Sequence, residues 1–214
     1  MLELGVKLLL AYLLGTLLGS LLLGRLRGVD IRDMGSGNAG ATNALRTQGK
    51  LFGFLVLLVD IAKGLFAVWW LPSAVLPGVG VDPQLPRDWL TAACGFAVIV
   101  GHVYPVWFSF RGGKGAATVV GVIAAVDPWL ILPLVVSWFI VLVLTGYVGL
   151  ATMLSGVVLV IVVGIVDPHN PALLSFCALV AGFIIYTHRG NIARMRAGQE
   201  NRVRRLWLFR SRTA

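Results

Sequence analysis

The sequence predicts an all-α integral membrane protein with seven transmembrane helices, and three observations lead to this fold class. Hydrophobic residues make up 58% of the 214-residue chain and charged residues only 13%, a balance far from that of a soluble domain. The mean hydropathy is +0.89. Apolar runs recur through almost the whole sequence, so neither a cleaved signal peptide nor a single anchor explains them. We therefore expect one membrane domain over residues 1–214, with no soluble second domain.

Seven apolar stretches are candidate spans, measured against the roughly 20 residues that cross a bilayer as a helix. They cover residues 5–23, 51–71, 89–106, 114–126, 129–144, 148–166 and 172–186. The fourth, fifth and seventh are short, so five crossings with re-entrant segments are the alternative. Asp-Pro pairs at Asp127 and Asp167 predict turns, because the residue before a proline disfavours helical geometry.

The distribution of Lys and Arg predicts the orientation. Basic residues gather in the loop after the first apolar stretch, in the loop after the third and in the C-terminal tail. The loop around residues 72–88, in contrast, has only Arg87. Since basic loops stay cytoplasmic, we expect the N-terminus outside and the C-terminus in the cytoplasm. The net charge is +9, and the basic residues that produce it lie next to the apolar stretches. This placement indicates anionic lipid headgroups as partners rather than nucleic acid. For the tail, residues 200–212, we expect a solvated, lipid-facing segment.

The stretch GSGNAGATN, residues 35–43, is called the first glycine loop. Its glycines allow backbone amides to turn toward one point, which is how an anion-binding nest is built, and neighbouring polar side chains add donors. The residues expected around the anion are Gly35, Ser36, Gly37, Asn38, Gly40, Thr42 and Asn43, with Arg46 as a bidentate cation. The alternative is a flexible turn before a helix that begins near Ala44, capped by Thr42 or Asn43.

The stretch GGKG, residues 112–115, is called the second glycine loop. It suits a phosphate in the same way, with amides of Gly112, Gly113 and Gly115 and the point charge of Lys114. It lacks the spacing of a Walker A motif, so nucleotide hydrolysis is disfavoured. Lys114 as a topology signal and His102 as an ordinary helix-end histidine are the alternatives. Two such loops on one membrane face indicate either two phosphorylated ligands or one ligand bound from both sides.

A third motif, HRGNIARMRAGQE, follows the last apolar stretch. His188 and Asn191 are three residues apart and share a helix face, while Glu200 is an acid among arginines and neutralises them in the simplest interpretation. Spacing alone does not make His188 a base.

Polar and sulfur-containing residues inside the apolar stretches need separate explanations. Asp60 and Lys63 share a helix face, and charges in hydrocarbon are costly enough to indicate either an internal ion pair or direct catalysis. Cys94 and Cys177 lie in mid-span and are interpreted as small packed hydrophobes rather than a disulfide or metal site.

The three motifs, in this order on a multi-pass chain, resemble those of the bacterial acyl-phosphate:glycerol-3-phosphate acyltransferases, the PlsY family. The resemblance covers almost the entire chain. It implies an enzyme of phospholipid biosynthesis that uses acyl phosphate and sn-glycerol 3-phosphate to make lysophosphatidic acid and phosphate. It further implies a site at the cytoplasmic face of the bacterial plasma (inner) membrane, a functional partner, PlsX, that makes the acyl phosphate, and no cofactor or metal.

The resemblance also implies roles for particular residues. Ser36, Arg46, Lys114, His188 and Asn191 are expected to be catalytic, and the second motif with Lys114 is expected to hold glycerol 3-phosphate. The substrate-binding set is Gly35, Gly37, Asn38, Gly40, Thr42, Asn43, His102, Gly112, Gly113 and Gly115. Glu200 is expected to be structural. This chain departs from the family at Gly146 and Gly149, where an arginine and a serine are usual, so side-chain contacts from that loop are not expected here.

The chemistry implied needs no enzyme nucleophile, because acyl phosphate already has a good leaving group. The sequence agrees with this. It contains no His-x4-Asp pair, because none of its histidines has an aspartate five residues later. A transporter of a phosphorylated solute is the competing class, but it calls for binding groups near the midplane, and here the motifs cluster on one face. A lipid-binding scaffold without chemistry is the third alternative.

Overall fold

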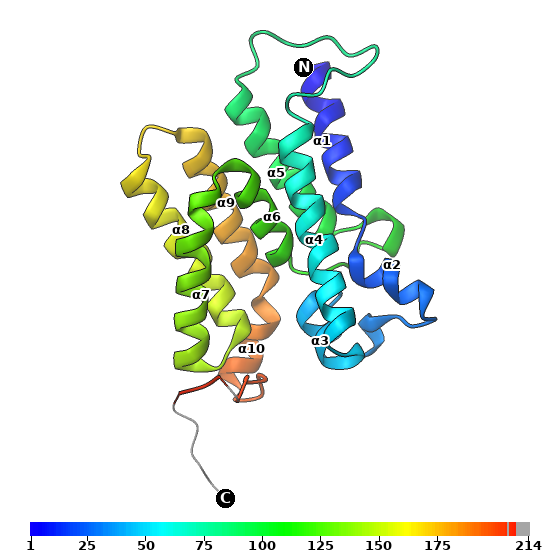
Figure 1. The fold of residues 1–214 in the computed structure, drawn as a ribbon, viewed down its shortest axis with the longest axis vertical. Helices are drawn as coiled ribbons and strands as arrows, with labels where there is room; N and C mark the ends of the chain where they lie inside the picture. Colours follow the sequence, from blue (N-terminus) through cyan, green and yellow to red (C-terminus); the bar gives the residue numbers. More distant parts are fainter. Residues whose placement is uncertain (205, 209–214) are drawn as a thin grey trace, which may run out of the picture. The chain divides into compact units, whose positions relative to one another are not determined.

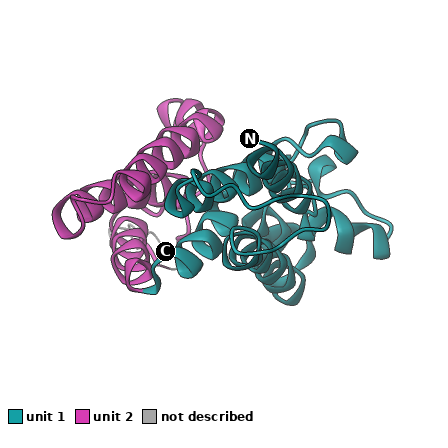
Figure 2. Cartoon of the chain, turned by 90° about the horizontal axis from the view of Figure 1, so that it is seen from above, with its two compact units in different colours: residues 1–128 teal, residues 129–214 magenta. Residues whose placement is uncertain are grey.

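The computed structural model describes residues 1–204 and 206–208, and every regular element in this part of the chain is a helix. The chain divides into two compact units, Met1–Pro128 (unit 1) and Trp129–Ala214 (unit 2), which Figure 2 colours separately. The all-helical prediction is confirmed for the described residues. That the two units form one domain stays a prediction.

Unit 1 contains six α-helices and two short 3-10 helices (Figure 1). In chain order they are α1 (Leu2–Gly15), α2 (Gly19–Leu26), η1 (Ile31–Asp33), α3 (Ala41–Gln48), α4 (Lys50–Trp70), α5 (Arg87–Val103), η2 (Val106–Phe108) and α6 (Ala116–Val126). The N-terminus and the connection between α4 and α5 lie at one end of unit 1, and α3 lies at the other.

Unit 2 is a set of antiparallel helices in which α8 packs against both α7 and α9. Its helices are α7 (Ile131–Thr145), α8 (Val148–Val166), α9 (Pro171–Thr187) and the short α10 (Arg189–Arg196), preceded by η3 (Pro128–Leu130). Asn170 caps α9 by accepting a hydrogen bond from the amide of Leu173, and Pro171 occupies the first helical position, where its missing N–H costs nothing.

Each of the seven predicted apolar stretches falls on a helix or on a bent helix pair. Four helices of the described residues are long and apolar enough to cross a membrane, or up to six spans if each bent pair, α1 with α2 and α9 with α10, is one span. The helix α6 is apolar but shorter. Helices end at Val126 and Val166, directly before the two Asp-Pro pairs, as predicted. The number of crossings and the orientation stay predictions.

The prediction of one continuous helix over residues 5–23 is wrong, because the chain bends by 46° between α1 and α2. Two buried charges on α4 hold this break. The Lys63 ammonium donates to the carbonyls of Gly15 (2.8 Å) and Leu17 (3.1 Å), and Asp60 accepts from the amide of Gly19 at 3.3 Å. The cation therefore meets the carbonyl end of α1 and the anion meets the amide end of α2, the arrangement that helix dipoles favour.

The alternatives left open for these two charges are now resolved in favour of an ion pair. The Lys63 Nζ lies 3.0 Å from Oδ1 of Asp60, and both side chains are buried. The cysteines are also placed as expected, since Cys94 and Cys177 are buried and not disulfide-bonded.

Glycines allow the closest helix contacts in unit 1. A Cβ atom on Gly64 of α4 would overlap the carbonyl of Thr118 on α6, and one on Gly121 of α6 would overlap the carbonyl of Ile61 on α4. Reciprocal small residues of this kind let two backbones approach, which is a common way of packing helices in membranes. The helix that follows the second glycine loop is thereby fixed against the helix that carries Asp60 and Lys63.

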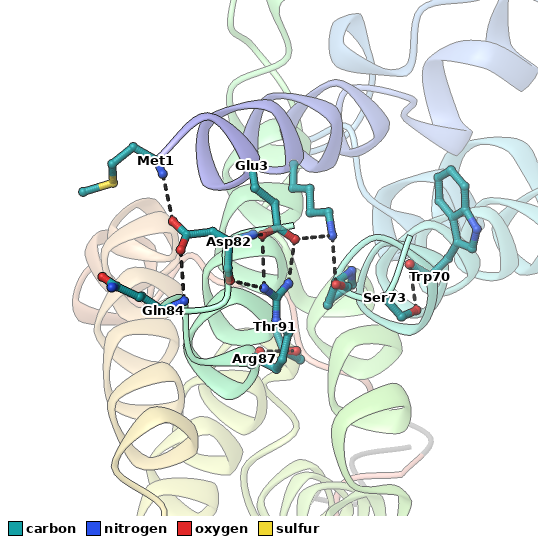
Figure 3. A network of polar contacts seen from close by, with 10 residues as sticks. Met1, Glu3, Trp70, Ser73, Asp82, Gln84, Arg87 and Thr91 are labelled. Atoms are coloured by element: carbon teal, nitrogen blue, oxygen red, sulfur yellow. Dashed lines mark hydrogen bonds and ion pairs between the residues drawn. The ribbon is translucent and has the colours of Figure 1, made fainter. Parts of the chain in front are cut away.

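A second buried lysine anchors the loop at the N-terminal end of unit 1 (Figure 3). Glu3 accepts from Lys7 at 2.8 Å, from Arg87 at 2.6 Å and from the amide of Asp82 at 2.7 Å, while Lys7 also donates to the carbonyl of Pro72. The N-terminal ammonium pairs with Asp82 and lowers the pKa of that carboxyl. This network ties the connection between α4 and α5 to the first turns of α1.

We expect Glu3→Ala to lower the melting temperature of the detergent-solubilised protein, because it leaves the Lys7 ammonium buried without its carboxylate. The matched control is Asp88→Ala, which removes an exposed carboxylate from the first turn of α5. Differential scanning fluorimetry of both variants tests the role of the network, and equal melting temperatures would contradict it.

Candidate active site

The first glycine loop is organised by Asn43, in the first turn of α3. The side chain is 2% exposed, and its Nδ2 lies 3.0 Å from three carbonyls, those of Ile31, Met34 and Asn38. Its Oδ1 accepts the amide of Ser36 at 3.0 Å. The polar atoms of Asn43 are thus occupied inside the loop, so this residue shapes the loop rather than presenting a donor to a ligand.

The expected helix start near Ala44 is wrong by three residues, because α3 begins at Ala41. The expected cap is also wrong. Gly40 occupies the N-cap position and no side chain, neither of Thr42 nor of Asn43, makes a capping hydrogen bond there. Glycine is among the residues that tolerate an N-cap position without a side-chain bond.

The glycines of this loop provide backbone shape more than they provide amide donors. Gly35 and Gly37 have φ values of 59° and 70°, in the left-handed region that favours glycine. A Cβ on Gly35 would also overlap Asn43. The amides of Ser36 and Gly37 are both used internally, since Gly37 donates to the carbonyl of Met34 at 3.0 Å. These two amides therefore do not form the anion nest that the sequence suggested.

The side chains that the first loop and α3 present to the outside are those expected to bind anions. Ser36, Thr42 and Arg46 are exposed, and Asn38 is half-buried. Thr42 and Arg46 are one helical turn apart on the same face of α3. The loop thus offers hydroxyl groups and one guanidinium at its surface.

The second glycine loop is folded back onto the end of α5. The amide of Gly112 donates to the carbonyl of Val103, and that of Gly113 to the carbonyl of His102, both at 3.1 Å. These two amides are therefore engaged and do not serve as the phosphate donors expected from the sequence. Gly115 has a φ of 90° and is the N-cap of α6, so the loop ends in a helix N-terminus beside Lys114. The first amides of a helix have no intrahelical acceptor and suit an anion.

Arg32 joins the two glycine loops, and the sequence interpretation missed this role. Its guanidinium donates to the carbonyls of Phe108 (3.0 Å) and Arg111 (3.1 Å), just before the second loop, and pairs with Asp30 at 2.6 Å. The same guanidinium lowers the pKa of the Asp30 carboxyl. In the sequence, Arg32 stands out only as one of several basic residues after the first apolar stretch, and its place shortly before the glycines is the signal that could have indicated this role.

An apolar cluster lies beneath the same junction. Leu18, the N-cap residue of α2, and Leu21 of α2 pack with Ala39 of the first glycine loop and Phe108 of η2. Ser20 adds a hydrogen bond from its hydroxyl to the carbonyl of Ala39 at 2.7 Å. The two glycine loops therefore share one support, which begins at the break between α1 and α2.

In unit 2, the third motif lies where α9 bends by 52° into α10. His188 and Asn191 are both buried, and Nδ1 of His188 lies 2.8 Å from the carbonyl of Ile184. A carbonyl can only accept, so we infer that Nδ1 carries the proton and that Nε2 presents a lone pair. Glu200 accepts from Asn191 and from Arg194, each at 2.6 Å, which fixes the Asn191 amide and fits the structural role expected for Glu200.

The two glycines that depart from the family pattern both lie in tight contacts. A Cβ on Gly149 would lie 2.9 Å from Nδ2 of Asn191. Gly146, with a φ of 76°, accepts a hydrogen bond from the amide of Val203 and packs against Trp207. A serine at 149 would displace the Asn191 side chain.

The described part of the C-terminal tail is mostly exposed, as the sequence predicts, but it also makes contacts that the sequence did not predict. The Arg202 guanidinium lies 4.5 Å from the ring of Tyr147 and 4.1 Å from that of Trp207, and the Trp207 indole donates to the carbonyl of Leu144. This part of the tail therefore packs on the connection between α7 and α8. Residues 205 and 209–214 of the expected tail lie outside the described residues.

We expect Asn43→Ala to raise hydrogen exchange at the Ser36 amide by about tenfold or more, because that amide loses its acceptor and the loop loses its internal contacts. Thr42→Ala is the matched control, since it shortens an exposed side chain in the same helical turn. Exchange measured by mass spectrometry on peptides covering residues 34–38 makes the comparison. Equal exchange in the two variants would mean that Asn43 does not organise the loop.

Comparisons with known proteins agree with the resemblance of the three motifs. The family model described as glycerol-3-phosphate acyltransferase matches residues 6–198. A glycerol-3-phosphate acyltransferase of Geotalea daltonii is 38% identical over 191 residues, which are 89% of this chain and 93% of that protein.

Two crystal structures of PlsY, an integral membrane glycerol 3-phosphate acyltransferase, are similar to this chain at 35% sequence identity, over 93% of this chain and 94% of theirs. The TM-score is 0.81 for the glycerol 3-phosphate form and 0.78 for the lysophosphatidic acid form. The chain belongs to the glycerol-3-phosphate acyltransferase family.

Proposed function

We propose that this protein transfers an acyl group from an acyl phosphate to sn-glycerol 3-phosphate, giving 1-acyl-sn-glycerol 3-phosphate (lysophosphatidic acid) and inorganic phosphate. The acceptor and product follow from family membership and from the two ligand forms of PlsY. The acyl phosphate donor is the finer part of the proposal. It rests on the motif resemblance and on a site suited to two phosphate groups.

The observation that carries the proposal is the junction of the two glycine loops at one end of unit 1. Arg32, just before the first loop, donates to the carbonyls of Phe108 and Arg111 just before the second, and an apolar cluster with Ala39 and Phe108 supports both segments. Each loop brings its own cation, Arg46 for the first and Lys114 for the second. A reaction between two phosphate-bearing substrates requires such a pair of cationic sites on one membrane face, whereas a CoA thioester donor needs only one near its reacting group.

The side chains and the glycines have different tasks in this proposal. Ser36, Asn38, Thr42 and Arg46 bind phosphate oxygens at the first loop. Lys114, with the first amides of α6, binds the phosphate of glycerol 3-phosphate. The loop glycines and Asn43 act by shaping these surfaces. They are Gly35, Gly37, Gly40, Gly112, Gly113 and Gly115.

The transfer proceeds by direct attack. A hydroxyl oxygen of glycerol 3-phosphate bonds to the acyl carbon, the bond from that carbon to the bridging phosphate oxygen breaks, and the departing phosphate takes the hydroxyl proton. The enzyme contributes positioning and charge stabilisation, with the first-loop hydroxyls and the cations neutralising the phosphate. No thiol takes part, because Cys94 and Cys177 are buried in helices.

In unit 2, His188 and Asn191 are proposed to orient the attacking hydroxyl. The hydrogen bond from Nδ1 of His188 to the carbonyl of Ile184 fixes the orientation of the ring. Glu200 holds the amide of Asn191 in one orientation. Both side chains are buried, which favours a single geometry.

The membrane context completes the proposal. We place the protein in the bacterial plasma (inner) membrane, with seven crossings, the N-terminus outside and the glycine loops facing the cytoplasm. The two units act as one catalytic domain, and the family model covers residues of both. Charged, short-lived acyl phosphate is then received from the soluble side, where PlsX is the proposed supplier. No metal or cofactor is part of the reaction proposed.

The donor assignment is tested with purified protein in detergent, supplied with glycerol 3-phosphate and either palmitoyl phosphate or palmitoyl-CoA. We expect lysophosphatidic acid and inorganic phosphate in equal amounts from palmitoyl phosphate, and no product from palmitoyl-CoA. Mass spectrometry of the lipid and a colorimetric phosphate assay measure the two products. Equal turnover with palmitoyl-CoA would refute the donor assignment.

The first-loop assignment is tested with Ser36→Ala. Removing a donor that stabilises charge in the transition state costs roughly a hundredfold in turnover. The matched control is Ser73→Ala, which removes an exposed hydroxyl from the opposite end of unit 1. Full turnover by Ser36→Ala would mean that the first loop does not bind the reacting phosphate.

A further inference from the structure

Lys63 contacts more acceptors than an ion pair requires. Besides Asp60 and two carbonyls at the helix break, its ammonium lies 2.9 Å from Nδ1 of His102 on α5. Lys63 is 5% exposed and His102 is 2% exposed. The ammonium therefore joins the break between α1 and α2 to the end of α5, where the carbonyl of His102 holds the second glycine loop.

This contact selects one tautomer of His102. An ammonium group has three donors and no acceptor, and here its three N–H groups are shared among four neighbours: the carbonyls of Gly15 and Leu17, Asp60 and Nδ1 of His102. A proton on Nδ1 would point at these donors, so the nitrogen 2.9 Å away faces the ammonium with its lone pair. The carboxylate of Asp60 also lies near Nδ1, but at the longer distance of 3.4 Å. We infer that His102 is neutral and carries its proton on Nε2.

The protonated edge of His102 faces the second glycine loop. A Cβ on Gly113 would overlap Nε2, so only glycine allows the loop to lie against the ring. The loop is held there by the bond from the Gly113 amide to the His102 carbonyl. The described polar contacts of the ring, to Lys63 and Asp60, are both made by Nδ1. Nε2–H is thus the donor that the ring directs to the loop side.

The pair of Asp60 and Lys63 is poorly explained as a device for stability. Burying two charges costs more than their attraction returns unless the remaining atoms are satisfied. Here Oδ2 of Asp60 is buried without a hydrogen-bond partner among the described residues. A group left unsatisfied in this way indicates a requirement other than stability.

We propose that Lys63 is a positioning residue of the glycerol 3-phosphate site: its buried ammonium, paired with Asp60, holds His102 as the Nε2–H tautomer against Gly113, so that the second glycine loop and this N–H receive a phosphate monoester. The proposal deepens the proposed function and rests on it for the identity of the ligand. It gives Lys63 no contact with substrate.

The tautomer is tested on the wild-type protein by ¹⁵N NMR of histidine side chains in detergent micelles. His169→Gln and His188→Gln assign the remaining signal to His102, because the chain has three histidines. We expect a neutral ring with the proton on Nε2, and a shift of that nitrogen when glycerol 3-phosphate is added. A ring protonated on Nδ1, or on both nitrogens at neutral pH, would overturn the proposal. This spectrum does not depend on turnover, so it remains decisive if the donor assignment fails.

The effect on the site is tested with Lys63→Met. We expect the KM for glycerol 3-phosphate to rise about tenfold or more, as for the loss of a hydrogen bond to a charged group, with a smaller change in kcat and in the KM for acyl phosphate. The spectrum of this variant should lose the Nε2–H form. The double variant Asp60→Asn with Lys63→Met removes both charges, so it leaves no unpaired buried charge that could impair folding. Its KM for glycerol 3-phosphate should be raised as much as that of Lys63→Met.

Lys7→Met is the matched control, because it removes another buried ammonium paired with a carboxylate, at the opposite end of unit 1. It should lower stability and leave the KM for glycerol 3-phosphate unchanged. A wild-type KM in the folded double variant would overturn the proposal, and so would an equal rise of KM in Lys7→Met, which would mark the effect as general destabilisation.

Discussion

The buried ion pair of Asp60 and Lys63 is the interaction on which the arrangement of unit 1 depends. Charges at this depth need partners, and here the partners are the carbonyl end of α1, the amide end of α2 and the ring of His102. One pair on α4 thereby bends the first apolar segment and also fixes the end of α5. The two glycine loops, which follow these two points in unit 1, are therefore placed relative to that pair.

The glycine loops divide their work between backbone and side chains. Glycines supply left-handed turns and close approach, as Gly35 does against Asn43 and Gly113 does against His102. Such loops are often expected to present their backbone amides to a ligand. Here some of these amides donate hydrogen bonds within the protein and hold the loops in place. The groups that remain for the proposed binding are exposed side chains, such as Arg46, and the start of α6. A loop rich in glycine is therefore not by itself an amide nest, and its internal hydrogen bonds decide how many donors remain.

Much of the fold could be predicted because hydrophobic length is a local property. Each apolar stretch became a helix or a bent pair, and each Asp-Pro pair ended one. The break at residues 16–18 could not be predicted, since its cause, Lys63, lies more than 40 residues away. The hydrogen bonds of Asn43 and Arg32 could not be predicted for the same reason, because both side chains donate to carbonyls that only folding brings near. The motifs indicated the family from residue types, whereas the internal hydrogen bonds that occupy Asn43 and several loop amides could not be predicted from them.

In the proposed reaction, the two glycine loops bind two different phosphate-bearing substrates. Steady-state kinetics of Lys114→Met, with glycerol 3-phosphate and acyl phosphate varied in turn, separates the two sites. We expect the KM for glycerol 3-phosphate to rise while the KM for acyl phosphate stays near its wild-type value, because the cation of the second loop belongs to one substrate only. An unchanged KM for glycerol 3-phosphate, in a folded variant, would contradict the assignment of the second loop and with it the claim of two separate phosphate sites.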